Sequence, residues 1–169
     1  MGLRGGVDAK YYVEARFDAP DTPPAITWLA TLGNSNFQDA VARYLEGMRL
    51  PCQNNGPVTF RGMYEFRMEG DSYTLLKDMS LRDFLGAATD LKGPIFFELS
   101  SMDCPFDLRI EYLRPYSKNI VSELEKTNPN RQLLIDWLST LTLNLGKENG
   151  IKVLGNQFNL TVPCGKVDL

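Results

Sequence analysis

Apolar and polar positions alternate in several short segments between residues 57 and 114. In segment 57–68 most of the apolar residues share one parity, and most of the charged residues share the other. Successive side chains of a strand point to opposite faces, so this segment is predicted to be a half-buried strand. Glu69-Gly70-Asp71 then predicts a hairpin to a second strand at 72–76. Residues 107–112 also alternate, whereas 95–99 is nearly continuously apolar and predicts a central strand covered on both faces.

The N-terminal part of the chain carries one further strand and one helix in this pattern. Residues 10–18 alternate and predict the first strand, while 26–32 fits no single period. Apolar residues at helical spacing follow Ser35 and Asn36, either of which can cap a helix. The spacing therefore predicts a helix over 36–49.

Three more helices are predicted from capping residues and apolar stripes. Ser80, with Asp83 three residues later, predicts a helix ending near Lys92. Ser117 is predicted to cap a short helix over 117–124. Pro129 suits the first turn of the longest helix, which Gly146 or Gly150 can end. The apolar stripe of this helix comprises Leu134, Trp137, Leu138, Leu141 and Leu145.

The predicted elements give an α+β fold. Two last strands, 151–154 and 157–162, flank Gly155-Asn156, which suits a type II′ hairpin. Adjacent strands joined by short turns imply a mainly antiparallel sheet, with about four helices packed largely on one face. A chain of 169 residues lies within the range of one domain. We expect a flexible N-terminus at 1–9, a single domain at 10–163 and a loose C-terminal tail at 164–169.

Composition and cysteine usage indicate a soluble, cytoplasmic protein. The net charge of −3 and an isoelectric point near 5.0 do not favour nucleic acid or an anionic membrane as partners. No apolar stretch approaches 18 residues, and the start of the chain lacks the apolar run of a signal peptide. Cys52, Cys104 and Cys164 are odd in number and widely spaced. This arrangement speaks against a disulfide framework and a zinc site, and it fits a reducing compartment.

The sequence contains no histidine, and this excludes many catalytic sites. Ser-His-Asp and Cys-His pairs and His-ligated metals are impossible, and no phosphate-binding glycine loop occurs. A metal-dependent nuclease could use Asp78 or Asp83 with Asp90 and Lys92, but the preferred interpretation is that Asp83 caps a helix and that Asp90 and Lys92 end it. Asp103 beside Cys104 would raise the thiol pKa and disfavour a nucleophile. We therefore expect no enzyme and no cofactor.

One group of side chains suggests a binding site: Arg61, Arg67, Arg109 and Arg114. Three of them lie on the polar parity of predicted neighbouring strands, where guanidinium groups could bind a carboxylate or phosphate. Acidic residues share those parities, so the preferred interpretation is cross-strand ion pairing, worth about 0.2–1 kcal/mol a pair.

Three functional hypotheses follow, in order of preference. The first is a non-catalytic interaction or assembly domain, such as an inhibitor, immunity protein, adaptor or virion-type subunit, that binds another protein or itself through a sheet edge or helix face. The second is a binder of a small anionic ligand or nucleotide that uses the four arginines. The third is an enzyme that relies on carboxylates, a metal or cysteine. Aromatic residues could stack nucleic-acid bases, but their spacing assigns most of them to the core.

Overall fold

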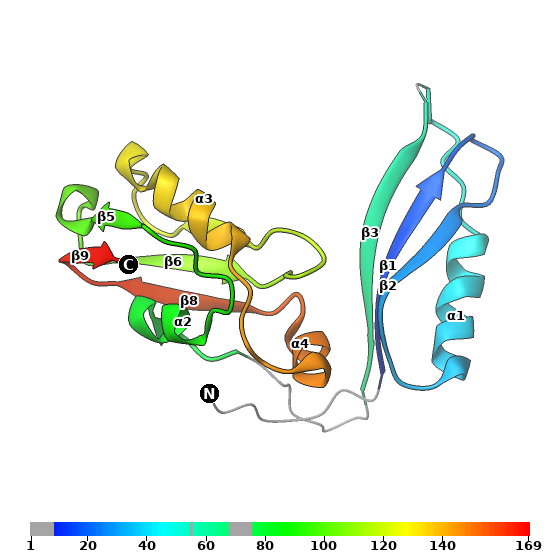
Figure 1. Ribbon diagram of the computed structural model, residues 1–169. Coiled ribbons are helices and arrows are strands. Elements are labelled where there is room, and N and C mark those ends of the chain that lie inside the picture. The colour runs from blue at the N-terminus through cyan, green and yellow to red at the C-terminus, as the bar shows by residue number, and fades with distance from the viewer. Residues whose placement is uncertain (1–8, 55, 68–75) are drawn as a thin grey trace. The chain divides into compact units, whose positions relative to one another are not determined.

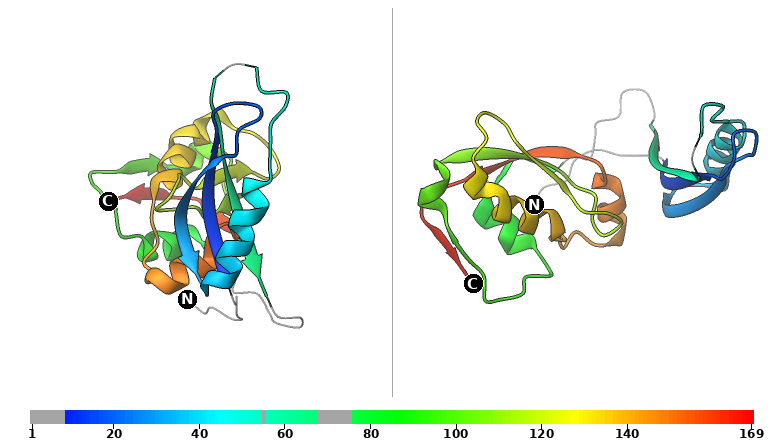
Figure 2. Two further views of the ribbon diagram at one scale, coloured as in Figure 1. Left: turned by 90° about the vertical axis from the view of Figure 1, so that its right-hand side faces the viewer. Right: turned by 90° about the horizontal axis from the view of Figure 1, so that it is seen from above.

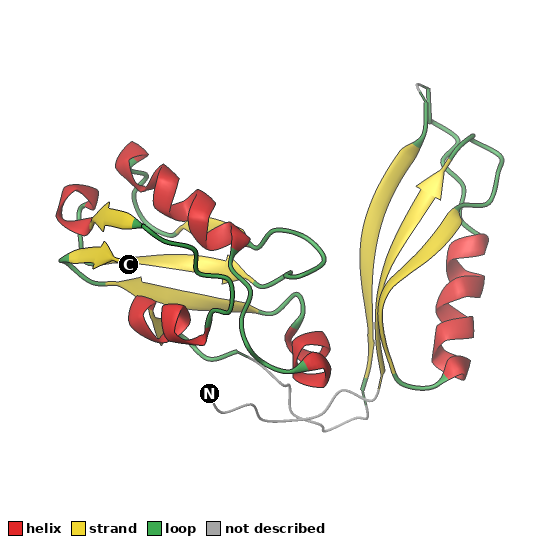
Figure 3. Cartoon of the chain, viewed as in Figure 1, coloured by secondary structure: helices red, strands yellow, loops and turns green. Residues whose placement is uncertain are grey.

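The chain folds as an α+β protein with mostly antiparallel strands, as the sequence predicts (Figure 3). The computed structural model describes residues 9–54, 56–67 and 76–169. Its contacts divide the chain into two compact units, one spanning Arg4–Thr74 and the other mainly Leu75–Leu169. Each unit contains a hydrophobic cluster of its own. The described residues thus form two clusters, one in each unit, within the span 10–163 that the sequence predicts as a single domain.

The N-terminal unit is a three-stranded antiparallel sheet in the order β2-β1-β3, with helix α1 on one face (Figure 1). Tyr11 and Val13 of the central strand pack against Val41 and Leu45 of the helix. The strand predicted at 10–18 and the helix predicted at 36–49 are confirmed, and the ambiguous segment 26–32 is a strand. The elements are β1 (Ala9–Phe17), β2 (Ala25–Leu32), α1 (Ser35–Glu46) and β3 (Val58–Phe66).

Helix α1 begins one residue earlier than the sequence predicts. Asn34 is its N-cap, and the Asn34 side-chain oxygen accepts hydrogen bonds from the backbone N–H groups of Asn36 and Phe37 at 3.0 and 3.3 Å. An Asn in this position satisfies amides that have no partner within the helix. The predicted caps, Ser35 and Asn36, lie inside the first turn instead.

The C-terminal unit contains a four-stranded sheet in the order β4-β8-β6-β7, in which only the β4–β8 pair is parallel. A second, two-stranded sheet pairs β5 with β9. The strands are β4 (Met79–Ser80), β5 (Phe96–Glu98), β6 (Phe106–Glu111), β7 (Ile120–Glu123), β8 (Gln157–Val162) and β9 (Lys166–Asp168). The helices are α2 (Leu81–Ala87), α3 (Gln132–Thr140), α4 (Lys147–Val153) and the 3-10 turns η1 (Leu99–Met102) and η2 (Pro129–Arg131).

Helices α2 and α3 cover the same face of the four-stranded sheet (Figure 2). Leu108 and Ile110 of β6 point to this face and are fully buried with Phe84, Leu134 and Leu138 of the two helices. Asp107 and Arg109, which alternate with these residues, are exposed on the opposite face. The predicted strand at 107–112 and the helix starts at Ser80 and Pro129 are thus confirmed. The predicted helix ends are wrong, because α2 stops at Ala87 rather than near Lys92 and α3 stops at Thr140, which leaves Leu141 and Leu145 outside a helix that is shorter than α1.

Residues 117–124, predicted as a helix, contain strand β7. The reason is Asn119, a buried residue whose side-chain nitrogen donates to the carbonyl oxygens of Leu138 and Leu141 at 3.2 and 2.9 Å. Its side-chain oxygen accepts hydrogen bonds from the amides of Leu113 and Arg114. These four bonds hold the chain next to β6, where β7 completes the ladder.

Residues 151–154, predicted as a strand, belong to helix α4 and its C-cap. The expected hairpin at Gly155-Asn156 does not form, because both residues hydrogen-bond to the backbone of Tyr112 instead. The amide of Gly155 donates to the Tyr112 oxygen at 2.7 Å, and the amide of Tyr112 donates to the Asn156 oxygen at 3.0 Å.

Residues 95–99 contain a strand as predicted, but its predicted central position and the predicted loose tail at 164–169 are both wrong. The two segments pair with each other as β5 and β9, and the Leu169 backbone exchanges two hydrogen bonds with Ile95 at 2.8 and 2.9 Å. The tail is therefore ordered, and Val167 is buried. Among the described residues β5 pairs with β9 alone, and Phe96 is 59% exposed.

Several predictions lie outside the described residues: the flexible segment before residue 9, the turn at Glu69-Gly70-Asp71 and most of the strand at 72–76. Within the described ranges, no helix has both the length and the apolar character needed to cross a membrane.

Candidate functional site

The four arginines stand in two different sheets. Arg61 and Arg67 lie on β3 and just after it, whereas Arg109 lies on β6 and Arg114 follows β6. Strand β3 pairs with β1, and β6 pairs with β7 and β8. The prediction that these strands are neighbours is wrong, and a shared ligand-binding role of the four side chains stays a prediction.

On the N-terminal sheet, Arg61 and Glu65 of β3 form ion pairs with β1. The register places Glu14 opposite Arg61, and the Arg61 Nε donates to the Glu14 Oε2 at 3.1 Å. Lys10 lies opposite Glu65, and the Lys10 Nζ is 2.8 Å from the Glu65 Oε1. The second Glu65 oxygen accepts a hydrogen bond from Arg67. These contacts support the ion-pair interpretation for Arg61 and Arg67.

The Lys10–Glu65 pair is unusual because the Lys10 side chain is fully buried. Burial disfavours the ammonium and lowers the pKa of Lys10, although Glu65 opposes this shift. Burial alone would raise the pKa of Glu65, but the hydrogen bonds from Lys10 and Arg67 outweigh it and lower that pKa. Glu65 therefore remains ionised at neutral pH and holds the start of β1 against the end of β3.

Strand β3 is an outer strand of its sheet. It pairs with β1 over nine consecutive residues without a break in register, whereas the β1–β2 pairing shifts between Tyr12 and Val13. No strand among the described residues pairs with the other edge of β3. A long, regular outer strand offers unpaired backbone donors and acceptors along that edge.

The two faces of β3 differ in chemistry. On the face toward α1, the Phe60 ring stacks on Phe17 and the Phe66 ring stacks on Phe37. The opposite face carries Thr59, Arg61, Met63 and Glu65. Between the aromatic residues lies Gly62, where an added Cβ would stand 3.1 Å from the Tyr64 ring. The Tyr64 ring thus lies across the glycine.

The edges of the C-terminal sheet are shorter. Strand β7 has four residues and exposes Ile120, which retains 52% of its accessible surface. On the other side, β4 has only two residues before α2 begins. The long edge of β3, which pairs with no strand among the described residues, is therefore the better candidate for a protein interface.

Arg109 and Arg114 have different surroundings. Arg109 is exposed and faces Ser122 and Asn159 on the flanking strands. Arg114 is half-buried, and its Nε donates to the Thr142 Oγ1 at 3.2 Å. It lines a cavity of about 230 Å³ together with residues from the chain between α3 and α4 and from α4 itself.

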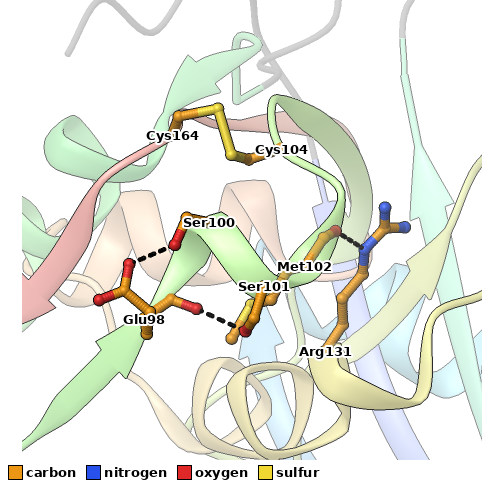
Figure 4. Close-up of a disulfide and its surroundings, with 7 residues drawn as sticks. All are labelled: Glu98, Ser100, Ser101, Met102, Cys104, Arg131 and Cys164. Carbon is orange, nitrogen blue, oxygen red and sulfur yellow. Dashed lines mark hydrogen bonds between the residues drawn. A yellow bond between two sulfur atoms is a disulfide. The ribbon is translucent and has the colours of Figure 1, made fainter.

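Cys104 and Cys164 form a disulfide, contrary to the expectation of unpaired cysteines (Figure 4). Their Cα atoms are 5.0 Å apart although 60 positions separate them in the sequence. The pairing could not be read from the spacing, because β9 returns the C-terminal segment to β5 only in the folded chain. Such a bond is more typical of oxidising compartments, so cysteine usage no longer supports the expectation of a cytoplasmic protein. Cys52 is free and exposed.

The chain beside the disulfide is held by local hydrogen bonds (Figure 4). Ser100 and Ser101 donate to the side chain and backbone of Glu98 at 2.6 and 3.0 Å. The Arg131 Nε donates to the Met102 oxygen at 2.8 Å, and its guanidinium carbon lies 4.0 Å from the centre of the Phe106 ring. These contacts fix the 3-10 turn η1, and no free thiol remains at Cys104.

The carboxylates considered for a metal-dependent nuclease have structural partners. Asp78 accepts from the Asn159 amide and Asp90 accepts from the Thr142 amide, both at 2.8 Å. The Asp83 amide donates to the Ser80 hydroxyl as the helix cap predicts. Among the described residues, no group of three acidic or cysteine side chains could hold a metal ion.

The chain matches no protein-family model, no curated protein sequence and no solved structure.

Proposed function

We propose that this protein is a non-catalytic assembly domain that associates with a second copy of itself through β3. The observation that carries the proposal is the unbroken nine-residue outer strand, whose second edge has no strand partner among the described residues. Strand addition at such an edge supplies main-chain hydrogen bonds, and side-chain pairs set the register.

A two-fold antiparallel pairing of β3 with itself suits the side chains best when it is centred on Met63. In this register Arg61 lies opposite Glu65 of the second copy, which gives two symmetric pairs of opposite charge. A register centred on Gly62 would place Thr59 opposite Glu65 and would lose these pairs. Charge complementarity therefore favours Met63 as the centre.

The other face of the strand supports the same register. Centring on Met63 places Gly62 opposite Tyr64 of the second copy and Phe60 opposite Phe66. An aromatic ring facing a glycine across a strand pair covers the backbone that the glycine leaves bare. Pairs of aromatic residues contribute further packing across the new ladder.

The test uses opposite charges at the centre of the pairing. Met63 would face its own copy, so Met63→Lys and Met63→Asp each bring two like charges together and weaken the dimer. Mixing the two variants in equal amounts places lysine opposite aspartate and restores it. Sedimentation velocity should therefore find a wild-type dimer, two monomeric variants and a dimeric mixture, with circular dichroism confirming that each variant is folded.

Ser122→Lys and Ser122→Asp are the matched controls, because Ser122 is exposed on the outer strand of the other sheet. These variants should remain dimers. A wild-type protein that stays monomeric across the micromolar range would refute self-assembly. A dimer that the Met63 substitutions leave intact would place the interface elsewhere than β3.

A further inference from the structure

The cavity beside Arg114 is built by three segments of the C-terminal unit. Backbone hydrogen bonds join the end of α2 to the chain after α3: the Thr89 amide donates to the Thr142 oxygen at 2.9 Å, and the Asn144 amide donates to the Ala87 oxygen at 2.7 Å. The Leu143 amide donates to the Tyr112 hydroxyl at 3.0 Å. Two main-chain bonds and one bond to the Tyr112 hydroxyl therefore hold the segment 142–144 of the cavity wall.

Arg114 lines this cavity, and only one of its side-chain nitrogen atoms donates a hydrogen bond to a described residue. Its Nε is bound to the Thr142 hydroxyl, whereas its Nη2 lies 3.8 Å from the nearest Asp90 oxygen. Asp90 is itself held by Thr142, whose amide and hydroxyl donate to its two oxygens at 2.8 and 3.2 Å. Within the described part of the chain, neither terminal nitrogen of Arg114 donates a hydrogen bond, and Arg114 retains 29% of its side-chain surface.

The lining of the cavity combines positive charge with apolar surface. Arg114 and Lys147 are its charged members, and the lining contains no carboxylate. Leu143, Leu145 and Ile151 supply the apolar part. At Gly146 and Gly150 an added Cβ would meet no atom within 4 Å, so the first turn of α4 leaves the space open.

Tyr112 adds a neutral donor to this lining. The side chain is buried, and burial raises the pKa of its hydroxyl although the hydrogen bond from Leu143 opposes the shift. The oxygen accepts the Leu143 amide, so the phenolic proton can be donated to a bound group.

We propose that this pocket binds a small monocarboxylate with a short apolar body. The carboxylate would accept two parallel hydrogen bonds from the Nη atoms of Arg114, the geometry for which a guanidinium is suited. The apolar body would lie against Leu143, Leu145 and Ile151. The cavity is smaller than the roughly 300–1,000 Å³ typical of drug-sized ligands, which limits the ligand to a compact molecule. This inference is independent of assembly through β3.

The test titrates the full chain with benzoate, benzamide and inorganic phosphate, followed by amide NMR and calorimetry. Benzoate should shift the amide signals of Gly146 and Gly150, and benzamide, which lacks the charge, should bind at least about tenfold more weakly. Phosphate should bind more weakly than benzoate, because it leaves the apolar wall uncovered. Stronger binding of phosphate would overturn the proposed ligand class.

Arg114→Gln should weaken benzoate binding by at least about tenfold, since the paired donors are lost. Arg109→Gln is the matched control: it removes an exposed arginine of the same unit outside the cavity and should leave binding unchanged. Lys147→Gln changes an exposed side chain of the lining and should weaken benzoate binding by a smaller factor. It tests the proposal if Arg114→Gln does not fold. Benzoate binding that survives both Arg114→Gln and Lys147→Gln, or that moves neither glycine signal, would overturn the proposal.

Discussion

Strands β3 and β6 carry similar alternating charges, but the charges behave differently in the two sheets. On β3, Arg61 and Glu65 meet Glu14 and Lys10 on the neighbouring strand and form ion pairs. On β6, Arg109 faces Ser122 and Asn159 and makes no ion pair with any described residue. Alternation along one strand thus predicts which face is polar, whereas ion pairing depends on the strand that lies beside it.

The largest expected difference between the units comes from the cross-link that only the C-terminal unit carries. Replacing both Cys104 and Cys164 by serine releases a loop of 60 residues and should lower the free energy of unfolding of this unit by about 4 kcal/mol. Urea unfolding measures this in a Trp28→Phe background, where Trp137 is the remaining tryptophan.

Cys52→Ser is the control for this prediction, since the Cys52 thiol is free and exposed. It should change the unfolding free energy by less than about 0.5 kcal/mol. In a Trp137→Phe background Trp28 reports the unfolding of the N-terminal unit. An equal loss of unfolding free energy in that transition would contradict the assignment of the cross-link to one unit.

The next effect isolates the buried ion pair of the N-terminal sheet. Glu65→Gln removes the carboxylate next to the fully buried Lys10 and should cost about 3 kcal/mol, the lower end of the range for breaking a buried pair. Trp28 reports this transition in a Trp137→Phe background. Glu111→Gln, a half-buried glutamate on β6 with no ion pair among the described residues, should cost less than about 0.5 kcal/mol.

The pH dependence of the same variant checks the cause. The folded pKa of Glu65 lies below its ordinary value of 4.5, so its contribution to stability is fully present above that value. The contribution is lost as the pH falls through the folded pKa. Glu65→Gln should therefore flatten the acid limb of the stability curve, and an unchanged limb would show that Glu65 is not stabilised by its neighbours.

The smallest expected effect concerns the more exposed pair, Arg61 and Glu14. A double-mutant cycle with glutamine at both positions should give a coupling free energy of about 0.5 kcal/mol, because both side chains remain partly solvated. The same cycle on Arg109 and Glu111 should give a value near zero. Equal couplings in the two sheets would remove the distinction drawn between β3 and β6.

The sequence predicted the elements whose pattern is complete within a single segment. An apolar periodicity of their own marks seven elements: β1, β3, β6, β8, α1, α2 and α3. A capping residue also marks the start of α2, and a proline marks the start of η2. Hydrophobic alternation therefore sufficed to identify the α+β class and the buried face of β6.

Elements fixed by distant partners were predicted wrongly or missed. Ile120, Val121 and Leu124 fit helical spacing, but Asn119 hydrogen-bonds to the carbonyl oxygens of Leu138 and Leu141, and Ile120–Glu123 pairs with β6 as a strand. The pairing of β9 with β5 depends on a chain reversal that leaves no local pattern. Among the site residues, Arg114 was identified, but the cavity beside it depends on Thr142 and Gly146, which lie about 30 positions away and carry no signal of their own.

The contact between Gly62 and Tyr64 has a consequence for how this sequence can vary in evolution. An alanine at position 62 would require the Tyr64 ring, which also meets Tyr44 edge to face, to shift by a few tenths of an ångström. Homologous chains that keep the tyrosine should therefore keep the glycine, and chains with a larger residue at 62 should carry a smaller one at 64. Such covariation would make these two positions a signature by which distant relatives of this sheet can be identified.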